Sequence, residues 1–170
     1  MKKLSVMASA ILALLAGSTI MSLAQAEDLE IRKAYTPKAA HDLWVEYGHA
    51  GNLDAMLTLY ETDAAIWDIG TGKSWTTPEE RRVFLQEFLD TVSSFYLETA
   101  SVTLNGAGDV ALLRSKWYAE GVSEDEAGKR SEWTSRNCGS EVVRKQADGS
   151  WLFIVDNPYA ATSWDACPSY

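Results

Sequence analysis

A carboxylate at the end of an apolar strand is the first residue in this sequence that suggests chemistry. Ile66 and Asp68 lie two positions apart in the alternating stretch Ala64–Asp68, so in a strand they point to the same face. We expect that face to be interior. Burial raises the pKa of a carboxyl group, which suits it to accept and return a proton. Alternatively, Asp68 caps the glycine-rich loop over residues 70–74.

Two further carboxylates, Glu141 and Asp156, fall in strand-like stretches late in the chain. Acid–base chemistry needs a second group that stabilises the developing charge, and Glu141 is a candidate for that role. Asp156 shares a strand face with Ile154, which makes it a second candidate base. The competing interpretations are a solvated or salt-bridged Glu141 and an Asp156 that caps the turn at Pro158.

Tryptophans are frequent in the predicted strands, and seven occur in the chain. Trp117 shares one strand face with Leu113 and Ser115, and Trp133 and Trp151 follow on later strands. An aromatic wall with few polar groups suits a flat, apolar ligand. Packing against a helix explains the same side chains, so both interpretations stay open.

Other chemistries find little support in the sequence. His41 and His49 are the only histidines, both early in the chain, so no histidine-rich metal site is expected. Residues 70–74 (GTGKS) lack the spacing and the following helix of a phosphate-binding loop. We therefore predict no metal and no cofactor.

The N-terminus has the layout of a secretory signal peptide. Lys2 and Lys3 precede an apolar run, and Ala24–Ala26 supplies a small-x-small cleavage site. We predict a signal peptide over residues 1–26 and a periplasmic or secreted mature protein; a retained membrane anchor is the alternative. The formal net charge of −9 argues against nucleic acid and anionic membranes as partners.

The two cysteines, Cys138 and Cys167, both lie in the part predicted to be exported. In an oxidising compartment an even pair most simply forms one disulfide, which would tie the C-terminal tail to a late strand. Two free buried thiols are the alternative.

The elements that position these residues can be read from caps and periodicity. Helices are predicted from Thr36–Pro37 to Gly48, from Asn52 to Tyr60 and from Pro78 to about Thr91, the last with Phe84 on its apolar side. From Phe95 the period becomes two, which predicts long strands to about residue 155, with a bulge at Gly139. Residues 27–170 then form a single α+β domain with a tail over about 158–170. A cone-like curved antiparallel sheet wraps round three N-terminal helices and leaves a pocket at its wide end.

The order of elements and several local motifs resemble the nuclear transport factor 2-like superfamily, in particular its SnoaL-like and ketosteroid-isomerase-like domains. The resemblance covers roughly residues 37–157 and rests on Ala50–Asp54, Asp63–Ala64, Asp68 and Asp148–Trp151. It implies the wrapped-sheet fold. It does not fix the activity, because this scaffold carries isomerases, dehydratases, cyclases and non-catalytic binding modules.

The resemblance also suggests residue roles. Asp68 falls where the steroid isomerases keep their general base, and Glu141 falls close to their protonated oxyanion-hole acid. Asp156 lies on the strand where related cyclases place an acid. Trp44 takes the position of the oxyanion tyrosine; its indole N–H donates a hydrogen bond but offers no phenol, which argues against steroid isomerisation itself.

We therefore expect an exported domain that binds a small apolar or aromatic molecule. As an enzyme it would be an isomerase or cyclase without a cofactor; the alternative is a non-catalytic ligand-binding or dimerisation module. A homodimer is expected by analogy, with no membrane contact after signal cleavage. The catalytic candidates are Asp68, Glu141 and Asp156, and the expected ligand-binding residues are Trp44, Ile66, Phe84, Trp117, Trp133, Ile154 and Asn157.

Overall fold

The computed structural model describes residues 30–69 and 71–167. The predicted signal peptide, residues 1–26, lies outside the described residues. None of the helices in the described part is long and apolar enough to cross a membrane.

Three helices begin where the sequence places their caps. They are α1 (Pro37–His49), α2 (Leu53–Leu57) and α3 (Pro78–Thr91). The side chain of Thr77 accepts a hydrogen bond from the backbone N–H of Glu80, and Glu80 reaches back to the N–H of Thr77. This capping box satisfies two amide groups that the first turn of α3 leaves free, so the helix start is fixed by local sequence.

The second helix is shorter than its apolar spacing predicts. Tyr60 fits the helical stripe, yet it is the first residue of β1 (Tyr60–Asp68). Arg81 of α3 donates hydrogen bonds to the backbone carbonyls of Glu61, Thr62 and Ala64. These bonds and the pairing of β1 with the sheet extend the strand back through the predicted turn, so Tyr60 becomes a strand residue.

Six strands form one curved, open sheet in the order β2-β1-β6-β5-β4-β3. The remaining strands are β2 (Lys73–Trp75), β3 (Val92–Leu104), β4 (Val110–Glu124), β5 (Arg130–Lys145) and β6 (Trp151–Asp156). The β1–β6 pair is parallel, so the sheet is mixed where an antiparallel one was expected. Short β2 occupies part of the stretch predicted to be a loop.

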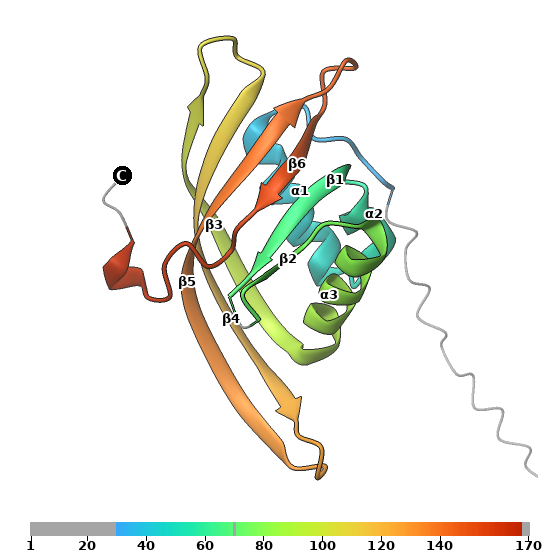
Figure 1. Ribbon diagram of the computed structural model, residues 1–170, viewed down its shortest axis with the longest axis vertical. Coiled ribbons are helices and arrows are strands. Elements are labelled where there is room, and N and C mark those ends of the chain that lie inside the picture. The colour runs from blue at the N-terminus through green and yellow to red at the C-terminus, as the bar shows by residue number, and fades with distance from the viewer. Residues whose placement is uncertain (1–29, 70, 168–170) are drawn as a thin grey trace, which may run out of the picture.

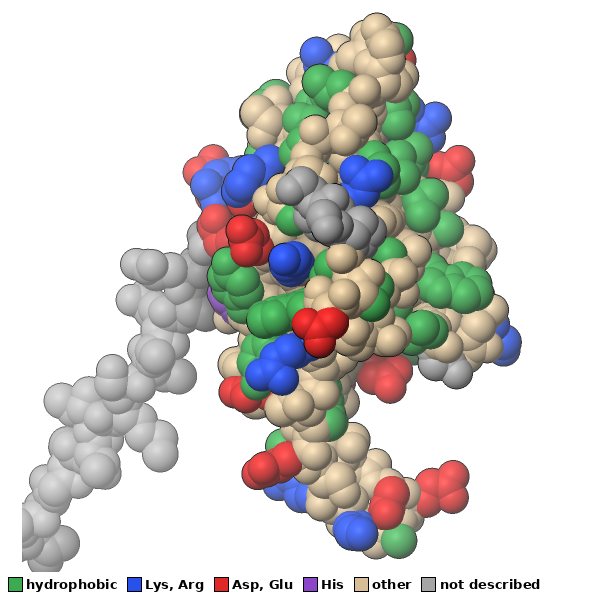
Figure 2. Space-filling view, turned by 90° about the vertical axis from the view of Figure 1, so that its left-hand side faces the viewer, with side chains coloured by type: hydrophobic (Ala, Val, Ile, Leu, Met, Phe, Trp, Pro, Cys, Tyr) green, Lys and Arg blue, Asp and Glu red, His purple; other side chains and the backbone are tan. Residues whose placement is uncertain are grey.

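The helices all lie on the concave side of the sheet, as Figure 1 shows. The core between these layers consists of fully buried side chains from α1, α2, β1, β4, β5 and β6, among them Tyr47, Met56, Ile66, Leu113, Val143 and Phe153. The far ends of β4 and β5 extend beyond the helices as a narrow arm. Figure 2 shows acidic and basic side chains interspersed along this arm and over the neighbouring face.

The C-terminal tail crosses the sheet after β6. Cys138 and Ala161 form an antiparallel bridge with N–O distances of 2.8 and 3.1 Å. The predicted disulfide between Cys138 and Cys167 is present, with Cα atoms 5.8 Å apart. A short 3-10 helix (Trp164–Ala166) precedes it. The bond therefore fastens the end of the tail to the middle of β5.

Candidate functional site

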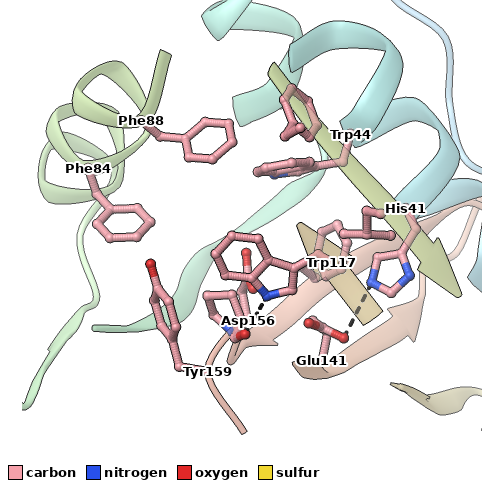
Figure 3. A pocket seen from close by; sticks show the side chains of 12 residues that line it. His41, Trp44, Phe84, Phe88, Trp117, Glu141, Asp156 and Tyr159 are labelled. Carbon is pink, nitrogen blue, oxygen red and sulfur yellow. Dashed lines mark hydrogen bonds and ion pairs between the residues drawn. The ribbon is translucent and has the colours of Figure 1, made fainter. Parts of the chain in front are cut away.

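A pocket lies between α1, α3, the sheet and the start of the tail. The space in and in front of it that no atom fills is about 600 Å³, which includes open solvent. Twelve residues line it, mostly aromatic: His41, Trp44, Phe84, Phe88, Phe95, Leu97, Trp117, Glu141, Phe153, Asp156, Pro158 and Tyr159. Figure 3 shows that Phe84 and Phe88 face the two carboxyl residues across this space.

Asp156 is the carboxyl group whose chemistry the pocket changes most. Asp156 is only 9% exposed, and the hydroxyl of Tyr60 donates a hydrogen bond to its Oδ2 at 2.6 Å. Burial, and then the nearby charge of Glu141, raise the pKa of Asp156 to about 7. This carboxyl group therefore changes its protonation state near neutral pH.

A short hydrogen-bond chain orients Asp156. The indole Nε1–H of Trp44 donates to the Tyr60 hydroxyl oxygen at 3.0 Å, and Tyr60 donates in turn to Asp156. Burial and the charge of Asp156 raise the pKa of Tyr60 well above its ordinary value, so the phenol stays protonated and remains a donor. Trp44 thus acts on Asp156 through Tyr60.

A register shift in β6 turns Asp156 into the pocket. Val143 pairs with Phe153 and Val142 pairs with Val155, so Ile154 has no partner in β5. The extra residue brings Phe153 and Asp156 to the same face, whereas regular alternation puts Asp156 with Ile154. Phe153 therefore lines the pocket, and Ile154 does not belong to the lining.

Glu141 lies beside Asp156 and is only 3% exposed. Its Oε1 accepts a hydrogen bond from the Ser115 hydroxyl at 3.0 Å, and its Oε2 lies 3.4 Å from Nε2 of His41. Among the described residues, no side chain or backbone group donates a hydrogen bond to Oε2. Arg144, which also lies on β5, does not pair with Glu141, because Arg144 binds Glu61 through two hydrogen bonds.

Gly139 makes room for this buried carboxylate. A Cβ atom at position 139 would lie 1.7 Å from Oε1 of Glu141 and 2.3 Å from the Ser115 hydroxyl oxygen. The predicted bulge at Gly139 is absent from the β4–β5 pairing, which runs without a shift through Ser115 and Gly139. The glycine is therefore needed for side-chain space.

Three polar residues of the site were not expected from the sequence. His41, buried on α1, hydrogen-bonds Thr99 through Nδ1 at 2.9 Å and faces Glu141 through Nε2. Its spacing of three from Trp44 places both on one helix face, a signal that sequence reasoning passed over. Tyr60 and Tyr159 were missed because one was assigned to a helix and the other to the tail.

Aromatic rings make the walls. Trp44, Phe88 and Phe95 form a cluster with ring centroids 5.3 to 5.6 Å apart. On the other side Trp117 meets Tyr159 edge to face at 5.4 Å, and its Nε1–H donates to the carbonyl of Pro158. The tail therefore supplies one wall of the pocket.

Asp68 is held at the end of β1 and is not one of the lining residues. Its Oδ2 accepts a hydrogen bond from the Thr71 hydroxyl at 2.8 Å, and its carbonyl accepts one from the N–H of Gly72 at 2.9 Å. These are the contacts of a residue that caps the following turn. Burial, and then the charge of Asp68, raise the pKa of Tyr159, so Asp68 lies near the pocket rim.

The other expected ligand-binding residues divide between the pocket and other places. Trp44, Phe84 and Trp117 line it. Ile66 is fully buried in the core, and Trp133 packs against Gly121. The Asn157 side chain accepts a hydrogen bond from the N–H of Tyr159 and so shapes the tail turn.

The described residues contain no group of three or more His, Cys, Asp or Glu side chains placed to hold a metal ion. Lysine and arginine are also missing from the twelve lining residues. The polar chemistry of this pocket is therefore that of two carboxyl groups, one imidazole and the tyrosine hydroxyls.

Solved structures with the same fold include proteins of different kinds. One is a ketosteroid isomerase-like protein from Erwinia carotovora atroseptica SCRI1043, with 20% identity over 71% of this chain and 89% of that chain and a TM-score of 0.57. Another, from the NTF2-like family of Streptomyces avermitilis, is described as a candidate dehydratase (14% identity, 73% and 94% covered, TM-score 0.55). A third, from Thiobacillus denitrificans ATCC 25259, is described as a candidate calcium/calmodulin-dependent protein kinase type II association domain. It has 14% identity over 75% of this chain and 98% of that chain, with a TM-score of 0.57.

No curated protein is detectably similar to the chain in sequence. A family model, however, matches residues 38–153, which span the three helices and nearly all of the sheet. Its description is the SnoaL-like domain. The resemblance seen in the sequence motifs is thereby confirmed, and the chain belongs to the SnoaL-like domain family within the NTF2-like fold.

Proposed function

We propose that the protein binds a small, largely apolar molecule in this pocket and moves a proton on it without a cofactor, as an isomerase or cyclase does. The observation that carries the proposal is the buried Asp156, whose pKa of about 7 lets it act as base and acid at the same pH. General catalysis is most effective when the pKa of the group lies near the working pH.

The proposed step is a proton shuttle. Ionised Asp156 takes a proton from a carbon next to a carbonyl group of the ligand, and the electron pair of that C–H bond moves to the carbonyl oxygen as an enolate. Asp156 then returns the proton to the same or another carbon, so no electrons are gained or lost overall. Nε2 of His41 forms no hydrogen bond with a described residue. When this nitrogen is protonated, its N–H stabilises the enolate oxygen.

Two features favour Asp156 over Asp68 as the base. Asp156 lines the pocket, and a tyrosine hydroxyl orients its carboxyl group. Asp68 instead accepts a hydrogen bond from the turn that follows it. Glu141 acts as the partner, because its charge adds to the effect of burial in raising the pKa of Asp156.

Hydrogen exchange between solvent and a range of small carbonyl compounds tests this proposal. The protein is incubated in D₂O with a panel of small ketones and enones, and loss of the α-hydrogen signals is followed by NMR. We expect Asp156→Asn to lower the exchange rate by about 100-fold or more and Asp68→Asn to leave most of it. Loss of exchange in Asp68→Asn, with exchange retained in Asp156→Asn, would assign the base to Asp68.

The competing function is a non-catalytic binding module. The likeness to an association domain from Thiobacillus denitrificans supports keeping this alternative. It predicts that ligands perturb the pocket signals of the NMR spectrum while no member of the panel exchanges hydrogen faster than in buffer. That outcome would leave the pocket as a receptor site.

We also propose that the chain is exported, cleaved after Ala26 and works in the periplasm or outside the cell as a homodimer. The disulfide between Cys138 and Cys167 supports an oxidising compartment. Mass measurement of the protein recovered from the periplasm tests export and the disulfide, because it reports the cleavage site and the two hydrogens lost when the bond forms.

A further inference from the structure

We propose that the ligand of this pocket is an organic cation, an ammonium group carried on a small apolar or aromatic body. This inference rests on the proposed function, since it names the ligand class of the same pocket. It follows from the aromatic walls, from the two buried carboxyl groups and from the missing cationic side chains.

Aromatic rings from several elements line the pocket. Trp44 comes from α1, Phe84 and Phe88 from α3, Phe95 from β3 and Trp117 from β4. The face of an aromatic ring carries partial negative charge and attracts ammonium groups, most strongly where water is excluded. A set of such rings around one space is the arrangement that holds methylated ammonium groups in other proteins.

The charged groups that meet the pocket are acidic. Asp156 on β6 and Glu141 on β5 are both at least nine-tenths buried, and neither Lys nor Arg belongs to the lining. An anionic ligand would enter without a counter-charge and beside two carboxyl groups. The formal net charge of −9 for the whole chain also attracts cations and repels anions.

Glu141 provides an independent observation that points to a ligand, because one of its carboxylate oxygens accepts no hydrogen bond from the described residues. Its Oε2 is buried, accepts no hydrogen bond from the described residues and lies 3.4 Å from Nε2 of His41. A buried carboxylate oxygen without a donor is costly. The positive charge of an ammonium group in the neighbouring pocket would compensate this buried carboxylate without direct contact to Oε2.

A ligand cation would also take the place of a proton. Burial, and then the charge of Glu141, raise the pKa of Asp156, since two neighbouring carboxylates repel each other. The other groups facing Asp156 are Tyr60 from β1, His41 from α1 and Tyr159 from the tail. A bound cation lowers the repulsion, so its binding should release a proton and should strengthen as the pH rises through 7.

A pair of isosteres tests the charge directly. Choline and 3,3-dimethylbutan-1-ol have the same shape, with nitrogen in the first replaced by carbon in the second. Isothermal titration at about pH 7.5 should show choline binding at least about tenfold more tightly than the alcohol. In two buffers of different ionisation enthalpy, the measured heat for choline should differ, which reports proton release, and the heat for the alcohol should not.

Two variants complete the test. Asp156→Asn and Glu141→Gln keep the side-chain shape and remove one charge, and each should reduce the preference for choline over the alcohol by about tenfold or more and abolish its buffer dependence. Val83→Ala on the exposed side of α3 is the control and should behave as the wild type. Equal affinity for the two isosteres, or no binding of choline, overturns the inference. If Asp156 nevertheless titrates near 7 by NMR, the proposed acid–base function stands even though the ligand is not a cation.

Discussion

At the level of single residues, the burial of Asp156 has a cost in stability that depends on pH. Its pKa is about 7 in the folded protein and near the ordinary value of 3.8 when unfolded. Between these values the folded state binds a proton that the unfolded state has lost, so the free energy of unfolding falls as the pH rises from about 4 to 7. The full shift corresponds to a loss on the order of 4 kcal/mol.

Asp156→Asn should therefore be more stable than the wild type at about pH 8, by on the order of 2 to 4 kcal/mol, with a smaller difference at about pH 5. Urea unfolding at both pH values measures this. Asp148→Asn is the control: Lys33 and Ser150 hold the pKa of Asp148 well below its usual range, so this substitution should have the same effect at both pH values. A pH-independent gain in Asp156→Asn would mean that its pKa is not raised.

Gly139 carries a second prediction at this scale. A methyl group there would occupy the position of Oε1 of Glu141, so Gly139→Ala should push that carboxylate away from Ser115 and His41. We expect a loss of about 1 to 3 kcal/mol in stability and a fall in the pKa of Asp156, because part of the neighbouring charge is removed. Urea unfolding and carboxyl NMR titration measure the two effects.

Gly106→Ala is the matched control, because nothing lies within 4 Å of a Cβ at that position. It should change neither the stability nor the titration of Asp156. If Gly139→Ala also changed neither the stability nor the titration of Asp156, Glu141 would have room to move within the pocket. Its proposed influence on Asp156 would then be weaker than the geometry implies.

At the level of elements, the sequence could predict features that depend on local signals, and it could not predict features that depend on long-range strand pairing. The starts of α1 and α3 follow from caps within a few residues, Thr36–Pro37 and Thr77–Glu80, so they could be read directly. Tyr60 was misassigned because its apolar spacing fits a helix while its partner in β6 lies far away in the sequence. No local pattern encodes such a pairing.

The site shows the same division. Glu141 and Asp156 were predicted as catalytic carboxyl groups, and both line the pocket. The residues that surround Asp156 were not predicted. The register shift beside Ile154 depends on how β6 fits between β1 and β5, so alternation selected Ile154 where Phe153 faces inward. Trp133 was expected at the pocket because alternation does not show that it lies opposite Gly121 and packs on that glycine.

The C-terminal tail is the element whose anchoring should matter for the pocket. Pro158 and Tyr159 form a wall, and the disulfide at Cys167 fastens the tail further along. Cys167→Ser should lower the free energy of unfolding by about 3 to 4 kcal/mol, the value for closing a loop of this length. It should also weaken choline binding while leaving the raised pKa of Asp156 in place.

Hydrogen exchange distinguishes an anchored tail from a loose one. In Cys167→Ser the amide groups of Cys138 and Ala161, which pair with each other's carbonyls, should exchange faster than in the oxidised wild type. Chemical reduction of the wild type should reproduce the result. Unchanged protection of these amides would show that Trp164, whose indole N–H donates to the carbonyl of Trp117, holds the tail without the disulfide.

At the level of the whole molecule, the convex face of the sheet is the surface through which we propose the homodimer to form. Tyr96, Tyr118 and Arg136 lie side by side across β3, β4 and β5, on the face opposite to Leu97 and Trp117. The guanidinium carbon of Arg136 lies 5.1 Å from the ring centre of Tyr118 and 5.7 Å from that of Trp164. Tyr96 is 56% exposed at the end of this row.

A charge placed in that row should separate the subunits. In a symmetric dimer each substitution appears twice at the interface, so Tyr96→Arg should convert a dimer to a monomer in sedimentation at micromolar concentration. Val83→Arg, on α3 and 62% exposed, adds the same charge elsewhere and should leave the dimer intact. Because the pocket opens on the opposite side of the sheet, the monomeric Tyr96→Arg variant should still bind choline; a wild type that sediments as a monomer would contradict the proposed assembly.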